Sequence, residues 1–350
     1  MRLRSHVLLV LVSIVGTGLL IACRSGSAPS ASGPASSTAA AGSGAPAANA
    51  PLTKLTVSYP EGGAHLPLWY AKEKGIFQKN GLNVDLQGLG GGPPAMAALL
   101  SNQTQFADIT GSVVTAANGA GSDVVVLATL DPVYPYVLEV PADIKSANDL
   151  KGKGIAVRAF GDATDVAARV ALQKLNLVPD KDVKIQAVNS EGARVAAVEA
   201  GQICCTVAQP QDQLVLEPQG YHVLVDFSTL GLLNAQGVIA AQRSYINANK
   251  ATVQAFMDSL VQAIAAEKDD KPGSVAIIKT YLKLDDKAAT VLYDYFVGKV
   301  IPSNPAVSAA QFVDGTAVLA TQNDKLKGFD MAKYVDTSFL QNAVAKGNKR

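Results

Sequence analysis

Cysteine, histidine and tryptophan are scarce in this sequence. Its 350 residues include three cysteines, three histidines and one tryptophan. Because the Cys and His residues do not recur at the spacing of a structural zinc site, we predict no metal site, and we also predict no cofactor. Cys204 and Cys205 are adjacent, so a disulfide between them would be strained, and small buried side chains are the simpler interpretation.

An excess of charge of one sign is missing as well. Lysine and arginine number 30, aspartate and glutamate 29, and the formal net charge is +1. Proteins that bind nucleic acid concentrate positive charge, and no dominant basic run occurs here. The sequence therefore predicts no nucleic-acid partner.

The N-terminus carries the pattern of a bacterial lipoprotein signal. Arg2 and Arg4 precede an apolar run at residues 7–22 that ends directly before Cys23. The run is shorter than the about 20 residues of a membrane-spanning helix, and its flanks are typical of a cleaved export signal. We expect residues 1–22 to be removed and Cys23 to be lipidated, which would anchor the protein on the extracytoplasmic face of the cell membrane. The alternative is an uncleaved anchor helix, which would leave the folded part on the same, extracytoplasmic side of the membrane.

Residues 23–51 consist almost wholly of serine, alanine, glycine and proline. A stretch without large apolar side chains cannot bury a core, so we predict a disordered tether. The remaining chain, residues 52–350, is long enough for two lobes.

Short β-rich runs alternate with stretches of helical periodicity from residue 55 onward. Strands are expected at residues 55–59, 83–86, 106–109, 124–130, 137–140, 154–158, 183–188, 203–207, 223–227 and 238–241. Helices are expected at residues 66–79, 95–100, 163–175, 193–200, 285–296 and 308–326, and the chain after residue 245 is expected to be helical. This alternation predicts an α/β fold with largely parallel sheets.

Several motifs follow one another in a recognisable order. The first expected strand leads to HLPLWYAKEKGIF at residues 65–77, then to NGLNV at 80–84, GLGGGPP at 88–94, DLKGKGIAV at 149–157 and NKATV at 249–253. Their order and spacing resemble the ABC transporter substrate-binding proteins of the nitrate, sulfonate, taurine and thiamine-pyrimidine uptake group, the SsuA/THI5-like family. The resemblance spans nearly the whole chain after the tether.

The resemblance implies a type II periplasmic-binding-protein fold with two lobes. Each lobe would be a mostly parallel sheet flanked by helices. Lobe one would combine residues 52–130 with 237–350, lobe two would hold 141–226, and the chain would cross between them at 131–140 and 227–236. One departure is that many relatives carry aspartate in the strand where this chain has Cys204 or Cys205.

The same resemblance implies a function. A monomer of this family captures a small molecule, such as a sulfonate, taurine, a nitrate-like anion or a pyrimidine-type heterocycle, for an ABC permease and its ATPase, without catalysis. One alternative is an enzyme like the fungal pyrimidine-precursor synthases, which share the fold and use a histidine positioned like His65. Those enzymes carry a cysteine-rich cluster that residues 230–236 lack. The other alternative is a ligand-sensing lipoprotein without a permease.

Candidate ligand-binding residues are those in loops at the carboxyl ends of the expected strands, where such groups gather in α/β sheets. They are Tyr59, Glu61, His65, Gly90, Gly91, Gly92, Thr110, Ser112, Arg158, Phe160, Asp162, Thr164, Asn189 and Gln209.

Several of these candidates have a competing interpretation. In the resemblance His65 corresponds to a histidine that lines the site of pyrimidine-precursor relatives, but it could instead lie at the surface or cap a helix. Arg158 could hold an anionic group in a bidentate pair, or pair with Asp162 or Asp165 at a lobe surface. The glycine loop and the helix after it suit anionic oxygens, or form a simple turn. Ser112 and Thr164 lie near expected helix starts, so each could donate its hydroxyl to a ligand or cap a helix.

The acidic residues in these loops bear on the class of ligand. Glu61, Asp131 and Asp162 fall there, whereas cations are few. We therefore expect a monoanion, a zwitterion or a neutral heterocycle rather than a doubly charged anion.

Overall fold

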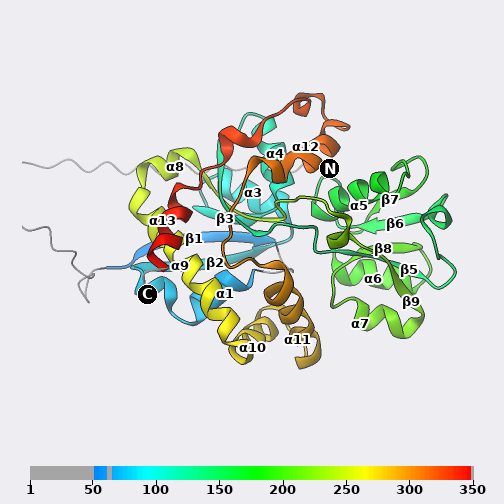
Figure 1. The fold of residues 1–350 in the computed structure, drawn as a ribbon, viewed down its shortest axis with the longest axis horizontal. Coiled ribbons are helices and arrows are strands. Elements are labelled where there is room, and N and C mark those ends of the chain that lie inside the picture. Colours follow the sequence, from blue (N-terminus) through cyan, green and yellow to red (C-terminus); the bar gives the residue numbers. More distant parts are fainter. Residues whose placement is uncertain (1–50, 61–64, 348–350) are drawn as a thin grey trace, which may run out of the picture. The chain divides into compact units, whose positions relative to one another are not determined.

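The chain folds around two five-stranded sheets (Figure 1). The computed structural model describes residues 51–60 and 65–347, which lie within one compact unit. The first sheet has the order β2 (Leu82–Leu89), β1 (Thr53–Pro60), β3 (Phe106–Ile109), β10 (Gly237–Gln242) and β4 (Val124–Asp131). The second has the order β7 (Lys184–Ala187), β6 (Gly154–Val157), β8 (Cys205–Ala208), β5 (Val137–Pro141) and β9 (Tyr221–Asp226). The predicted lipoprotein signal, Cys23, most of the tether and Glu61 lie outside the described residues.

Both sheets are mixed. Strand β1 pairs in parallel with β2 and β3, and β6 in parallel with β7 and β8. Strand β10 runs antiparallel to β3 and β4, and β5 runs antiparallel to β8 and β9. The predicted two-sheet α/β fold is confirmed, but "mostly parallel" overstates the parallel share. Parallel neighbours need a crossover connection, usually a helix, and β5 and β10 each enter from the other sheet through a segment without an α-helix.

Helices cover the sheets. Those between strands are α1 (Leu66–Glu73), α2 (Ile76–Lys79), α3 (Gly92–Leu100), α4 (Gly111–Gly119), α5 (Ala163–Lys174), α6 (Glu191–Glu199) and α7 (Gln213–Leu216). Those after β10 are α8 (Arg243–Ala248), α9 (Lys250–Asp269), α10 (Lys271–Leu282), α11 (Asp286–Tyr295), α12 (Val313–Ala320) and α13 (Ser338–Gly347). None of the helices in the described ranges combines the length and apolar character needed to cross a membrane.

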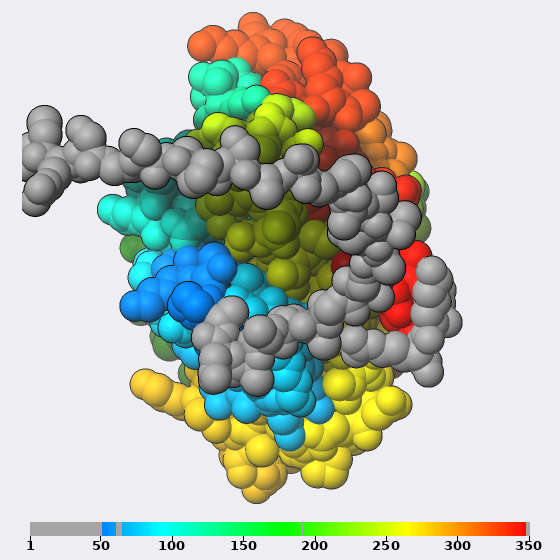
Figure 2. All heavy atoms as spheres, turned by 90° about the vertical axis from the view of Figure 1, so that its left-hand side faces the viewer, coloured from blue at the N-terminus to red at the C-terminus, as the bar shows by residue number. Residues whose placement is uncertain are grey.

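Most of the helices after β10 pack with the helices that cover the first sheet. Helix α1 packs against α9 and α10, and α13 packs against α9. On the face seen in Figure 2, blue-to-cyan residues from the start of the described chain meet yellow residues from these later helices. Helix α12 differs, because its Val318 and Leu319 are buried in the core formed by α5 and the second sheet.

Two predicted helices are wrong in detail. The helix expected at residues 66–79 is divided into α1 and α2 at Gly75, whose φ of 67° is left-handed and cannot continue a right-handed helix. The helix expected at 308–326 begins with a 3₁₀ turn, Ala309–Phe312, continues as α12 and ends at Ala320. A separate 3₁₀ turn, Asp324–Leu326, follows.

Glu139 is an ionisable residue inside the second sheet. It lies in β5 and is fully buried, and neither carboxyl oxygen has a hydrogen-bond partner among the described residues. Burial, followed by the negative charge of Glu217, raises the pKa of Glu139 from 4.5 to about 7. A carboxyl whose pKa is higher in the folded than in the unfolded state reduces stability as pH rises between those two values.

Glu139→Gln is therefore expected to make stability less dependent on pH. The fall in unfolding free energy between pH 5 and pH 8 should shrink by about 2 kcal/mol, because the residue no longer ionises in a buried position. Chemical denaturation at both pH values measures this difference. An exposed glutamate that does not contribute to the pKa of Glu139 provides the control: Glu199→Gln should change this pH dependence by less than about 0.5 kcal/mol. An unchanged pH dependence in Glu139→Gln would contradict the assignment.

Candidate functional site

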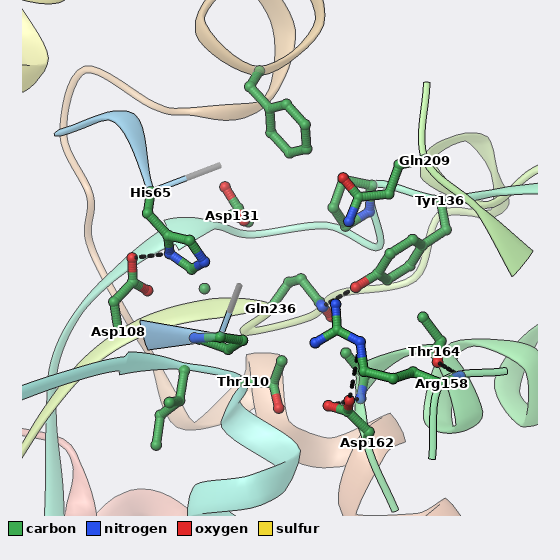
Figure 3. Close-up of a pocket in the computed structure, with 16 residues that line it drawn as sticks. His65, Asp108, Thr110, Asp131, Tyr136, Arg158, Asp162, Thr164, Gln209 and Gln236 are labelled. Atoms are coloured by element: carbon green, nitrogen blue, oxygen red, sulfur yellow. Dashed lines mark hydrogen bonds and ion pairs between the residues drawn. The ribbon is translucent and has the colours of Figure 1, made fainter. Parts of the chain in front are cut away.

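A cavity lies where strand ends of the two sheets face each other (Figure 3). Its volume is about 60 Å³, which exceeds the roughly 15 Å³ that one water needs and is far below the roughly 300 Å³ of pockets that enclose a drug-sized ligand. In this conformation it fits a small ion or one end of a ligand. The lining residues that carry polar groups are His65, Asp108, Thr110, Asp131, Tyr136, Arg158, Asp162, Thr164, Gln209 and Gln236.

His65 and Asp108 form one end of the cavity. His65 Nδ1 lies 2.7 Å from Asp108 Oδ2, and both side chains are buried. In the tautomer that carries its hydrogen on Nδ1, His65 donates to Asp108 Oδ2, which leaves Nε2 as an acceptor facing the cavity (Figure 3). The rings of Tyr59 and Trp69 hold the imidazole from behind, at centroid distances of 4.9 and 5.9 Å.

Asp131 is a second carboxyl at the same end. It is the last residue of β4 and is 6% exposed. Burial, with a further contribution from the charge of Asp108, raises the pKa of Asp131 well above its ordinary value. The negative charge at this end of the cavity is therefore costly without a donor or cation beside it.

Arg158 and Asp162 lie at the opposite end (Figure 3). Arg158 follows β6, and its Nε lies 3.8 Å from Asp162 Oδ2. The backbone N–H of Arg158 donates to Thr164 Oγ1 at 2.8 Å. Asp162 caps α5, because its Oδ1 accepts a hydrogen bond from the Ala163 N–H at 2.7 Å. The start of α5 therefore fixes three polar side chains at this end.

The two chain segments that join the sheets are linked beneath the cavity. Gln236 Nε2 donates to the Tyr136 hydroxyl at 2.7 Å, and Asn234 Nδ2 donates to Gln236 Oε1 at 2.8 Å. Burial, and then the charge of Asp162, raise the pKa of Tyr136, so the phenol stays neutral. Tyr136 belongs to the first predicted crossing and Gln236 to the second.

Six of the predicted site residues line the cavity. They are His65, Thr110, Arg158, Asp162, Thr164 and Gln209. Tyr59 packs behind His65, and Ser112 shares a hydrogen bond with Thr110, their hydroxyl oxygens 3.1 Å apart. Phe160 is 59% exposed, and Asn189 is also exposed, so neither reaches the cavity in this conformation. Whether any of these residues bind a ligand stays a prediction.

The predicted glycine loop is shorter than expected. Strand β2 continues to Leu89 and α3 begins at Gly92, so Gly90 and Gly91 alone connect them, with Gly90 exposed. The second sheet's polar residues lie close to this loop, since a carbon at the Cβ position of Gly92 would stand 3.4 Å from Asp162 Oδ1. The carboxylate of Asp162 therefore lies beside the start of α3, where an anionic ligand was expected.

Sequence reasoning did not name Asp108, Asp131 or Gln236 as ligand-binding candidates, although it placed Asp131 among the acidic residues of the candidate loops. The first two stand in or at the end of apolar strands, and a charged residue in such a run is the signal that could have identified them. Gln236 lies in a predicted crossing that was treated only as a connection. Across the described ranges no cluster of three or more His, Cys, Asp or Glu residues is placed to hold a metal ion.

Comparison with known proteins gives one family. The family model described as "NMT1/THI5 like" matches residues 63–270. The chain is 26% identical over 204 residues to "Putative binding protein YtlA" of Bacillus subtilis (strain 168). That match covers 57% of this chain and 61% of the length of YtlA.

Solved structures share the fold at lower identity. The alkanesulfonate-binding protein SsuA from Xanthomonas axonopodis pv. citri, bound to MOPS, matches with a TM-score of 0.68 and 22% identity, over 83% of this chain and all of that chain. The periplasmic nitrate-binding protein NrtA from Synechocystis PCC 6803 matches with a TM-score of 0.66 and 14% identity, over 85% of this chain and 90% of that chain.

Proposed function

Because the chain belongs to the NMT1/THI5-like family, we propose that it is a solute-binding protein that captures a small organic molecule for an ABC importer. A sulfonate, taurine, a nitrate-like anion and a pyrimidine-type heterocycle are the candidate ligands. The names of SsuA, NrtA and YtlA support a binding role, since each describes a binding protein.

The main support for this proposal is the position of the cavity between the two sheets. Polar side chains that follow β1, β3 and β4 of the first sheet face side chains that follow β6 and β8 of the second. Within the described residues, two segments of chain connect the sheets, and Tyr136 and Gln236 join these segments by a hydrogen bond. A site shared between two sheets on such connections can open to admit a ligand and close around it.

The finer parts of the proposal follow from the sequence. We propose that the protein is lipid-anchored through Cys23 on the extracytoplasmic face of the cell membrane, acts as a monomer, and is not an enzyme. The proposed lobes are residues 52–130 with 237–350, and 141–226. Membership of β1 to β4 and β10 in one sheet, and of β5 to β9 in the other, supports this division of the chain. Strand β5 starts at Val137, inside the crossing that was predicted at 131–140, so the proposed lobe two would begin within that crossing.

A thermal-shift screen of the full-length chain tests the binding role. Sulfonates, taurine, nitrate, pyrimidines and flavins are each added in excess. A compound at about 100 times its Kd stabilises the folded state by about 2.7 kcal/mol, so we expect at least one class to raise the melting temperature by about 4–8 °C.

Whether the bound compound is recovered chemically unchanged distinguishes a binding protein from an enzyme. We expect mass spectrometry to recover it unchanged after overnight incubation with the protein. A chemically altered compound would show an enzyme, and a blank screen across all classes would contradict the binding role.

A further inference from the structure

Two carboxyl groups of the cavity have unused acceptor atoms. Asp108 is fully buried and Asp131 is nearly so, and both line the cavity beside His65 (Figure 3). Asp108 Oδ1 and Asp131 Oδ1 accept no hydrogen bond from any of the described residues. Buried carboxyl oxygens are unfavourable without a donor, so this end of the cavity is suited to a ligand that donates hydrogen bonds.

The two carboxyls converge over Gly237. A carbon at the Cβ position of this glycine would lie 2.9 Å from Asp131 Oδ2 and 3.6 Å from Asp108 Oδ1. Gly237 begins β10 and lines the cavity. Because this residue has no side chain, a single ligand group placed over it can reach both carboxyls.

The unused acceptor atoms decide what that group is. An oxyanion such as nitrate or sulfonate brings only acceptor atoms, so it could not satisfy the carboxyl oxygens at this end. A hydroxyl donates one hydrogen and can satisfy only one carboxyl, whereas an amine, ammonium or amidine nitrogen donates two or three from one atom. The opposite end, where Arg158 and Thr164 lie, is the end suited to acceptor groups of the ligand.

We propose that the ligand carries a primary amine, ammonium or amidine-type nitrogen, and that this nitrogen binds between Asp108 and Asp131 over Gly237. The inference rests on the proposed binding function and narrows its ligand class to amino-bearing molecules, such as an aminosulfonate, an amino acid or an aminopyrimidine. Burial and the charge of Asp108 raise the pKa of Asp131, and a bound donor or cation relieves this cost.

Matched compounds test the inference on the full-length chain by calorimetry. Taurine is compared with ethanesulfonate, β-alanine with propionate, and 4-aminopyrimidine with pyrimidine. In every pair that binds, we expect the aminated member to bind at least about tenfold tighter. Asp131→Asn should reduce that preference to less than about threefold. Asp123→Asn is the matched control, because Asp123 precedes the same strand at its other end, is exposed, and pairs with Arg243; it should leave the preference unchanged.

The outcomes separate this inference from the proposed function. Equal or tighter binding of the amine-free members would overturn the inference and leave a binding protein. An undiminished preference in Asp131→Asn would overturn the assigned position of the nitrogen. If neither member of any pair binds, both the inference and the proposed function are contradicted. The wild-type comparison does not depend on the folding of a variant.

Discussion

Arg169→Met is expected to lower the free energy of unfolding by about 3–5 kcal/mol, the usual cost of removing one partner from a buried ion pair. Arg169 Nε donates to Asp165 Oδ1 at 2.7 Å, and Arg169 Nη1 donates to Asp180 Oδ2 at 2.7 Å. Asp165 is fully buried, and its other oxygen accepts from the Gly161 N–H at 2.8 Å. Without Arg169, the Asp165 charge stays buried next to the loop that carries the cavity's arginine.

Chemical denaturation followed by circular dichroism measures this loss. Arg243→Met is the matched control, because Arg243 pairs with Asp123 at the surface, where such a pair contributes less than about 1 kcal/mol. A loss below about 1 kcal/mol in Arg169→Met would show that Asp165 is neutral or solvated in the folded protein. Asp165→Asn combined with Arg169→Met should recover part of the stability, since no unpaired charge then remains.

His65→Ala and Arg158→Ala are each expected to weaken binding of the compound that the thermal-shift screen selects by about 1–3 kcal/mol. The two side chains lie at opposite ends of the cavity, and each presents polar nitrogen atoms to it (Figure 3). Removal of a hydrogen-bonding group from a buried site leaves the ligand atom without a partner, so affinity should fall by about tenfold to a hundredfold.

Calorimetry on each variant checks this result. His222→Ala and Arg243→Ala are suitable controls, because His222 lies in β9 and Arg243 starts α8, and neither lines the cavity. Unchanged affinity in both His65→Ala and Arg158→Ala would remove these residues from the binding site.

The order of strands and helices could be predicted because most buried strands here are short apolar runs next to glycine, proline or polar turns. Strand β3 lies at residues 106–109, as the pattern indicated. Strand β6 and helix α5 also begin where they were predicted, at residues 154 and 163. The direction of β5 and β10 could not be predicted, since local pattern does not reveal which sheet a strand joins after a crossing. The division at Gly75 depends on a backbone angle that a helical pattern does not report.

The candidate site was predicted in part for a similar reason. The rule that ligand-binding groups follow strand ends identified His65, Thr110, Arg158 and Gln209, all of which line the cavity. The rule overlooks Asp108, which lies inside β3 and reaches the cavity from the strand itself. It also predicted Phe160, which follows β6 as the rule requires but is 59% exposed and does not line the cavity.

The place of β10 has a consequence for how a newly synthesised chain acquires its structure. Among the described strands of the first sheet, β4 neighbours β10 alone, and two further backbone partners, Pro305 and Asp336, come still later in the chain. Every described strand of the second sheet comes from the continuous stretch 137–226. A nascent chain that leaves the ribosome or a translocation channel N-terminus first can complete the second sheet before β10 exists. Strand β4 therefore keeps an unpaired edge until residues 237–242 have been synthesised and can form β10. An unpaired edge of this kind promotes aggregation.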